Sequence, residues 1–428
     1  MKQLIKAYSL FYIFMAIIWQ PFQIYILKVD GAGRTIMIMS ILVILVNLYE
    51  FWKQKKIYMS MAFLCWMVLF CYSMANAFSK GFYAEFGTFA FLRKHFFDSF
   101  VLLIILMLEL KRDRQTCLWV IWAALSVYLL ICLPYFSLND EGRFDVEDVG
   151  NLLPLHAVSF LFVTSVLFIE NKINRVFFWI IVAGISALIL LSGTRKAFGA
   201  EAILLLGVIL NDGKKRNLWS WVRIGVFGAL LAVGVYYVVN NTSLGERILS
   251  STEDDGFYVQ LVDNQKINDF LMVLLGDRAG QYEMAIEFFH EHYWTGIGLT
   301  NYMDMSGGEM VLHPEYMVQL CENGMIGLVL LMLFYVWLII ALSISKRSNT
   351  SNKQGVGVSL FGLMTVMFLN LTGWSYNQNY IMIFYAIICM YAYFDRIKND
   401  TNENSRTSQR EQFQQSLDSI FGPAPDRV

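Results

Sequence analysis

Charged side chains are scarce in this sequence. Asp, Glu, Lys and Arg make up 16% of its 428 residues, whereas a soluble domain carries about 25%. Hydrophobic residues reach 57%, and they are grouped in runs of about 16–22 residues, long enough to cross the hydrocarbon core of a bilayer as helices. Because lipid offers no hydrogen-bonding partner to an open backbone, the sequence predicts an all-α polytopic membrane protein.

Motifs for nucleotides and metals are also lacking. The sequence has no glycine-rich phosphate-binding motif of the P-loop type, which argues against an ATP-driven pump. Most of the six cysteines lie in apolar runs, so no disulfide framework is predicted. His290 and His292 would lie on a helix, where residues two apart point in different directions, and His95 and His156 at the edges of apolar runs are expected to be structural. We therefore expect no metal, no cofactor and no nucleic-acid partner.

The apolar runs predict about twelve transmembrane helices, with a large extracytoplasmic loop between the ninth and the tenth. The chain would divide into a membrane bundle (1–240), this outer loop (241–323), three further spans (324–394) and a disordered polar tail (395–428). The spans are expected at approximately 7–27, 35–52, 57–78, 96–110, 116–136, 153–170, 176–193, 196–210, 222–240, 324–344, 356–373 and 380–394.

Lys and Arg are unevenly distributed between the two sets of loops. With the N-terminus placed in the cytoplasm, 22 of the 33 basic residues fall in inner loops or in the tail, and 11 fall outside. Basic loops favour the cytoplasmic side. Since an even number of spans returns the chain to its starting side, both termini are expected to be cytoplasmic.

The loop 241–323 is too long for a bare connection, and loops of that length are usually functional. Within it, 278–293 has the periodicity of an amphipathic helix lying on the membrane surface or over the bundle. Its acidic residues and His290 lie off the apolar face. Arg278 falls on that face, where a guanidinium needs an anionic partner or a water-filled cleft. The face is formed by Arg278, Tyr282, Ala285, Ile286, Phe289 and Tyr293.

Glycines and a proline punctuate the stretch 294–327. Gly296 and Gly298 allow a tight turn after the amphipathic helix. Pro314 suits the first position of a short helix. Gly324, after an asparagine, supplies a C-terminal stop or a bend into the next span.

The short helix carries polar side chains at every third position: His313, Tyr316, Gln319 and Glu322. Such residues lie roughly along one stripe, here at the outer membrane surface, where they would suit the wall of an active site. His313, expected at the N-cap, is the natural general base, because a neutral imidazole accepts a proton near neutral pH. The alternative, that His313 only caps the helix in a hydrated loop, stays open.

The stretch 190–201 (LLSGTRKAFGAE) separates two apolar spans and places Arg195 at the outer face. Its Ser-Gly-Thr turn offers amides and hydroxyls to an anion, and a guanidinium binds phosphate as a planar fork. A hairpin turn with snorkelling basic side chains is the alternative. Arg143 and Arg278 are outer guanidiniums on other segments, and together the three would suit a doubly charged pyrophosphate.

Three stretches together resemble the signature of the O-antigen ligase and polymerase family. GIGLTNY (296–302), followed by HPEYMVQLCENGMIGLVLL (313–331), resembles the family's Gly-x-Gly-x-x-Asn segment and its His-led helix ending in Glu-x-Gly-x-x-Gly. LSGTRKAF (191–198) resembles the family's Ser-x-Ser/Thr-Arg turn, and GRFDVEDVGN (142–151) loosely resembles an Arg-bearing outer loop. Pro314 departs from the pattern, because many relatives carry Asn there.

The resemblance implies a GT-C-like, metal-independent glycosyltransferase of the bacterial cytoplasmic membrane. Such enzymes move a glycan from an undecaprenyl-pyrophosphate carrier to an acceptor hydroxyl on the outer side of the membrane. By residue match, Arg195 and Arg278, with Arg143 less closely matched, would hold the pyrophosphate, and His313 would activate the acceptor. Supporting roles are expected for Glu322, Asn301, Tyr316 and Gln319. The implied partners are the lipid-linked donor, a glycan acceptor, membrane lipids and a chain-length regulator.

Three functions remain open at the level of sequence. We favour a polymerase that joins lipid-linked repeat units into O-antigen, capsule or exopolysaccharide. A ligase of the same family, which transfers a finished glycan to another acceptor, is the first alternative. A twelve-span transporter or flippase of lipid-linked sugars is the second, although such proteins usually carry internal repeats and midplane sites at broken helices, and the polar residues here gather in an outer loop.

Overall fold

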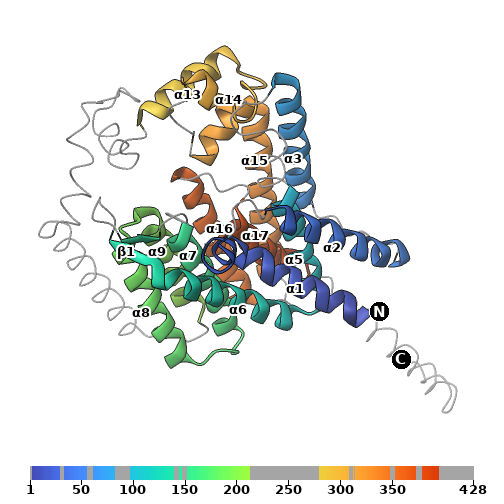
Figure 1. The fold of residues 1–428 in the computed structure, drawn as a ribbon, viewed down its shortest axis with the longest axis vertical. Coiled ribbons are helices and arrows are strands. Elements are labelled where there is room, and N and C mark those ends of the chain that lie inside the picture. Colours follow the sequence, from blue (N-terminus) through green and yellow to red (C-terminus); the bar gives the residue numbers. More distant parts are fainter. Residues whose placement is uncertain are drawn as a thin grey trace, which may run out of the picture.

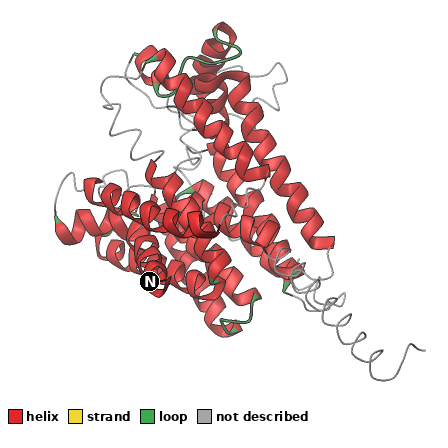
Figure 2. Cartoon of the chain, turned by 90° about the vertical axis from the view of Figure 1, so that its right-hand side faces the viewer, coloured by secondary structure: helices red, strands yellow, loops and turns green. Residues whose placement is uncertain are grey.

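The structure is a computed structural model, and the described part of it is almost wholly helical (Figure 2). A short antiparallel ribbon, β1 (Phe136–Leu138) with β2 (Phe144–Val146), is the exception among the described residues. The described residues are 2–28, 33–54, 61–81, 97–138, 144–146, 152–212, 279–307, 312, 314–347, 352–372 and 378–394.

The helices follow the predicted apolar runs. The predicted span 222–240 lies outside the described residues, and each of the other predicted spans coincides with a helix. In chain order the helices are α1 (Lys2–Pro21, continued by a π-helical turn, Phe22–Leu27), α2 (Gly33–Gln54), α3 (Met61–Lys80), α5 (Asp98–Arg112), α6 (Arg114–Cys132, then a 3-10 turn, Leu133–Tyr135), α7 (Leu152–Ile169), α8 (Arg175–Ser192), α9 (Arg195–Asn211), α13 (Ala279–Glu291), α14 (Asn301–Met305), α15 (Glu315–Arg347), α16 (Lys353–Thr372) and α17 (Asn379–Cys389, then a π-helical turn, Met390–Phe394).

Within the described part, seven helical segments are long and apolar enough to cross a membrane. They are Gln3–Leu27, Met61–Lys80, Arg114–Tyr135, Leu152–Ile169, Arg175–Ser192, Glu315–Arg347 and Lys353–Leu371. α7 is the most enclosed of these, with 89% of its apolar window buried. A helix that is apolar all round belongs at the centre of a bundle. The chain is therefore an all-helical polytopic membrane protein, as the sequence predicted.

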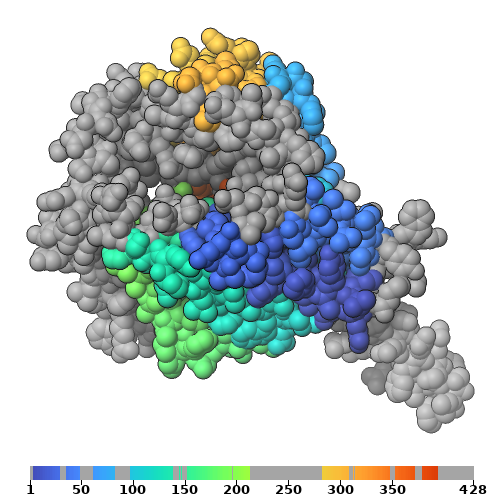
Figure 3. Space-filling model, viewed as in Figure 1, coloured from blue at the N-terminus to red at the C-terminus, as the bar shows by residue number. Residues whose placement is uncertain are grey.

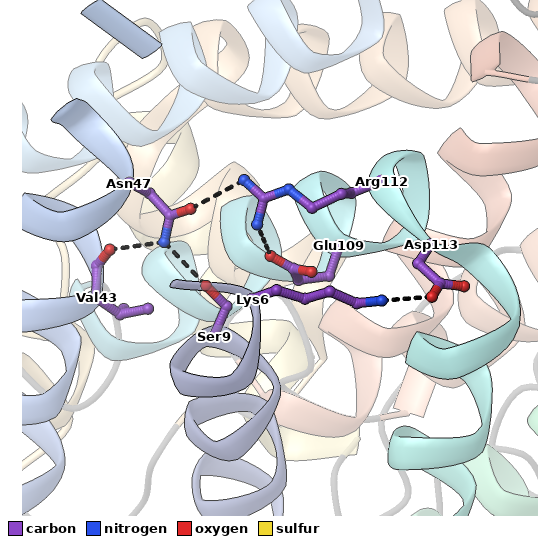
Figure 4. A network of polar contacts seen from close by, with 7 residues as sticks. All are labelled: Lys6, Ser9, Val43, Asn47, Glu109, Arg112 and Asp113. Atoms are coloured by element: carbon purple, nitrogen blue, oxygen red, sulfur yellow. Dashed lines mark hydrogen bonds and ion pairs between the residues drawn. The ribbon is translucent and has the colours of Figure 1, made fainter. Parts of the chain in front are cut away.

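One end of the bundle gathers the start of α1, the end of α2 and the junction between α5 and α6 (Figure 4). Lys6 Nζ donates to Asp113 at 2.5 Å, and this hydrogen bond contributes most to lowering the pKa of Asp113 to about 2. The Asn47 amide donates to Ser9 Oγ at 3.0 Å and accepts from Arg112 at 3.5 Å. We call this the Lys6 end.

A second set of contacts adds more helix termini to the Lys6 end. Arg114 at the start of α6 pairs with Glu170, which follows the last turn of α7. Tyr391 after α17 donates its hydroxyl to Glu170 at 2.5 Å. Ser345 near the end of α15 donates to the Tyr391 carbonyl at 2.9 Å. Chain segments far apart in sequence are thereby tied together by polar groups outside the apolar middle of the bundle.

The opposite helix termini meet at the other end, which we call the Asn76 end after the residue near the end of α3. Ser99 at the start of α5 donates to Asn379 at the start of α17, at 3.4 Å. Tyr25 in the turn after α1 stacks on Tyr135 after α6, with ring centroids 4.0 Å apart. Successive helices thus run in alternating directions between the two ends, as expected for a chain that crosses a bilayer repeatedly (Figure 1).

Candidate functional site

The candidate site is built around a kink in α15 at the Asn76 end. Gly324 leaves helical geometry there, with φ 66° and ψ −167°. The chain that follows α13 packs against this break. The amide of Ile297 donates to the carbonyl of Cys321 at 3.0 Å. The amide of Met325 donates to the carbonyl of Tyr293 at 2.9 Å. Backbone groups that a kink leaves without helical partners are therefore satisfied by the loop.

Two glycines make this close contact possible. Gly296 and Gly324 both have φ 66°, in the left-handed region that favours glycine. A Cβ on Gly296 would lie 2.5 Å from the carbonyl oxygen of Cys321, and a Cβ on Gly324 would collide with the backbone of Trp294. Any side chain at either position would push the loop off the kink.

The end of α3 fastens the loop and the kink together. Asn76 Nδ2 donates to the carbonyl of Thr295 at 2.7 Å and to that of Glu322 at 2.9 Å. The Tyr72 hydroxyl, one turn earlier on α3, donates to the carbonyl of Asn323 at 3.0 Å. Figures 1 and 3 place α3 beside α14 and the kinked region of α15. We call this assembly of the α3 end, the loop and the α15 kink the junction.

Asn301 and Glu322, both predicted to support the site, belong to the junction. Asn301 Nδ2 donates to the carbonyl of Gly81 just after α3, at 3.2 Å. The buried carboxylate of Glu322 accepts the backbone N–H groups of Thr300 and Tyr302. Thr300 has φ 71°, an uncommon conformation for a residue with a Cβ. The carboxylate helps to hold that conformation.

A small hydrophobic core lies under the loop, and α13 packs on it. Ala285 and Phe289 of α13 are buried, whereas its acidic residues and His290 are exposed, as the predicted amphipathic pattern requires. Burial raises the pKa of Tyr302 to about 12, so its phenol is neutral and can serve as a donor but not as a base near neutral pH. The core consists of Ala285, Ile297, Tyr302, Leu312, Met317, Val318 and Cys321.

The predicted polar stripe on the first turns of α15 faces three different neighbours. The hydroxyl of Tyr316 donates to the Met367 carbonyl of α16 at 3.1 Å. Gln319 is buried and donates to Glu315 at 2.8 Å. Glu322 holds the loop, as described above. In the part of the chain that the structure describes, these side chains join α15 to its surroundings.

Sequence reasoning missed three buried polar residues of the junction. Glu315, Gln319 and Asn323 stand four residues apart, the spacing of direct neighbours on a helix, whereas only the every-third-position pattern was noticed. Asn76 lies inside an apolar run, where a polar side chain usually has a specific partner. Both signals were readable, but neither named the partner.

The residues assigned to the chemistry fall mostly outside the described part. Arg143, Arg278 and His313 lie outside the described residues, and so does His95. Arg195 is the first residue of α9, but its side chain is not described. Whether these groups converge therefore stays a prediction.

The turn that precedes Arg195 has the predicted compact form. α8 ends at Gly193 in the left-handed conformation, with φ 62°. Ser192 Oγ donates to the carbonyl of Ile189 at 2.8 Å and accepts the backbone N–H of Thr194 at 3.4 Å. Only one residue, Thr194, separates this glycine from the first turn of α9.

Histidines in the described residues have structural surroundings. His156 is buried, its Nδ1 lies 2.9 Å from the Leu152 carbonyl, and its ring stacks on Tyr128 with centroids 4.0 Å apart. His290 and His292 lie on and just after α13. Across the described ranges, no group of three or more His, Cys, Asp or Glu side chains could hold a metal ion.

Fold and junction together define a class: an all-helical polytopic membrane protein whose extramembrane chain is locked onto a kinked helix at one end of the bundle. No protein-family model matches the chain, and no curated protein does either.

Proposed function

We propose that this chain is a GT-C-type glycosyltransferase with about twelve spans. It polymerises undecaprenyl-pyrophosphate-linked oligosaccharide repeat units at the outer face of the bacterial cytoplasmic membrane. The observation that supports this is the junction itself. Residues that carry the resemblance to the O-antigen ligase and polymerase family, from both halves of its main motif, contact one another or a shared partner: Gly296, Gly298, Asn301, Glu322 and Gly324. A match of letters by chance would give these residues no reason to meet.

The proposed orientation places the Lys6 end in the cytoplasm. The basic residues Lys6, Arg112 and Arg114 gather there, and Lys and Arg favour the cytoplasmic side. The junction and the turn before Arg195 then lie on the outer side. A lipid-linked donor would reach that side from within the bilayer.

The reaction forms a bond between the acceptor hydroxyl oxygen and the anomeric carbon of the donor, while the bond from that carbon to the pyrophosphate oxygen breaks. His313 would take the hydroxyl proton as general base. Arg195, Arg278 and Arg143 would stabilise the charge that remains on the departing pyrophosphate.

Deletion of the gene in its native host tests the proposal. Loss of polymer with accumulation of glycans one repeat unit long is expected of a polymerase. Long chains left on the lipid carrier would instead indicate a ligase. Purified protein in liposomes that moves lipid-linked oligosaccharide across the bilayer without joining it would indicate a flippase.

Complementation of that strain tests the site. Arg195→Ala, Arg278→Ala and His313→Ala should each abolish polymer formation, because each removes a group in contact with the reacting atoms, while the protein still inserts in the membrane. Lys172→Ala, an exposed cation between α7 and α8, is the matched control and should support normal polymer. Polymer of normal length from all three site variants would overturn the assignment.

A further inference from the structure

A chain of buried amides runs through the junction and ends on a carboxylate. Gln319 Nε2 donates to Glu315 Oε1 at 2.8 Å, and Asn323 Nδ2 donates to Gln319 Oε1 at 3.0 Å. Asn76 Nδ2 lies 3.5 Å from Asn323 Oδ1 and completes the chain from α3. Glu315, Gln319 and Asn323 are each 0% exposed.

The direction of this amide chain follows from its carboxylate end. An ionised carboxylate can only accept hydrogen bonds, so Gln319 must turn its NH2 group toward Glu315. The oxygen of Gln319 then accepts from Asn323, and the oxygen of Asn323 faces the NH2 group of Asn76. All the amides therefore point their positive ends toward Glu315. Aligned hydrogen bonds of this kind reinforce one another and favour a negative charge at the accepting end.

We infer that Glu315 is a positioning residue for glycan transfer, an inference that rests on the proposed function. The amide chain fixes a negative charge in the first turn of α15, two residues after His313. Cα atoms two residues apart are separated by at most about 7 Å, a range at which a buried charge acts strongly on another. When His313 takes the proton of the acceptor hydroxyl, the Glu315 carboxylate stabilises the imidazolium that forms.

A charge-relocation experiment separates this role from a structural one. Glu315→Gln keeps the shape of the side chain and removes its charge. Asn323→Asp, by contrast, places an acceptor against the acceptor oxygen of Gln319. Combined, the two changes restore a complete chain, because Gln319 can turn over, donate to the new carboxylate at position 323 and accept from the new amide at position 315. Asn76 still donates to the carboxylate at position 323, so every amide has a partner, and only the charge has moved.

The variants are compared in the deletion strain and, after purification in detergent, by thermal unfolding. Glu315→Gln is expected to lower the rate of polymer formation by about 10- to 100-fold, part of the 10²–10⁴-fold that general base catalysis supplies. The double variant should recover the midpoint of unfolding that Asn323→Asp loses, yet stay as slow as Glu315→Gln. Recovery of the rate together with the midpoint would show that hydrogen bonding alone matters, and would overturn the inference.

Two controls keep the test decisive. Should Glu315→Gln fail to accumulate in the membrane, the double variant, whose chain is complete, carries the comparison with the wild-type protein. A strain that makes no polymer even with the wild-type gene restored contradicts the proposed function. Normal polymer formation by the wild-type protein and by both charge-altered variants contradicts only the role of Glu315.

Discussion

Gly324 shows how a single residue determines the shape of the junction. It stands where α15 bends, its φ is positive, and the backbone of Trp294 occupies the space that a Cβ would need. The amides and carbonyls released by the bend pair with the loop instead of with the helix. Glycine is required here for two independent reasons, the backbone conformation and the close approach of another backbone.

Gly324→Ala should therefore destabilise the protein. The strained backbone conformation alone costs about 1–3 kcal/mol, and the collision with Trp294 adds to it. Thermal unfolding in detergent measures the effect. Gly184→Ala is the matched control, because Gly184 lies in α8 with nothing within 4 Å of its missing Cβ and alanine favours a helix over glycine by about 1 kcal/mol. Equal midpoints for Gly324→Ala and the wild-type protein would contradict this account of the kink.

At the scale of elements, α3 is the strut that holds the junction. Its last two turns contribute Tyr72 and Asn76, which bond to carbonyls of the loop and of α15. Along the same helix, Trp66 and Phe70 stack on Phe100 of α5, with centroids 5.6 and 5.1 Å apart. α3 therefore connects the junction to the helices of the bundle.

Asn76→Ala should loosen the junction more than the loss of one side chain suggests. Two carbonyls, those of Thr295 and Glu322, lose a buried donor, and each such loss costs about 1–3 kcal/mol. Limited proteolysis of the purified protein should then cut between residues 293 and 301 faster than in the wild-type protein. Ser79→Ala is the control, because Ser79 Oγ donates only within α3, to the Asn76 carbonyl at 2.8 Å. Equal cleavage rates for the two variants would mean that α3 does not secure the loop.

At the scale of the whole molecule, polar contacts concentrate at the two ends of an apolar bundle. The Lys6 end ties together termini of α1, α2, α5, α6, α7, α15 and α17. The Asn76 end ties together the opposite termini of α3, α5 and α17 and holds the junction. This arrangement fits a protein with a charged face on one side of the bilayer and a structured site on the other.

Cysteine labelling tests that arrangement. Trp294→Cys lies at the Asn76 end and Lys172→Cys at the Lys6 end, and both native residues are exposed. In intact cells whose outer envelope is made permeable, a membrane-impermeant maleimide should label position 294, while position 172 should react only after the cytoplasmic membrane is opened. The unsubstituted protein, with its six cysteines, supplies the background. Labelling of both positions from the same side would exclude the proposed crossing pattern, and reversed labelling would invert the orientation.

Much of the fold was readable from the sequence because lipid leaves few options. A long apolar run must satisfy its backbone within itself, so a helix was the only choice, and α7, α8 and α16 lie where the runs predicted them. The amphipathic pattern likewise predicted α13, and the glycine after an asparagine predicted the bend at Gly324.

The candidate site was readable only in part. The glycine and asparagine positions of 296–301 were singled out, but as a flexible turn rather than as one side of an interlocked contact. The every-third-position stripe directed attention to Tyr316 and Glu322 and away from Glu315 and Asn323. Periodicity shows which residues share a face of one helix, but it carries no information about the element that covers that face.

What the sequence alone determined is therefore everything that follows from the surroundings of a single segment: helices across lipid, an amphipathic helix outside it, and glycines where the chain must turn. What only the tertiary structure decided is the pairing of distant segments, in which Asn76 of α3 meets the loop and the kinked α15 more than 200 positions later, at sequence separations of 219 and 246 residues. The physical reason is that a buried amide states its need for a partner in the sequence, whereas the identity of that partner depends on how all the helices pack.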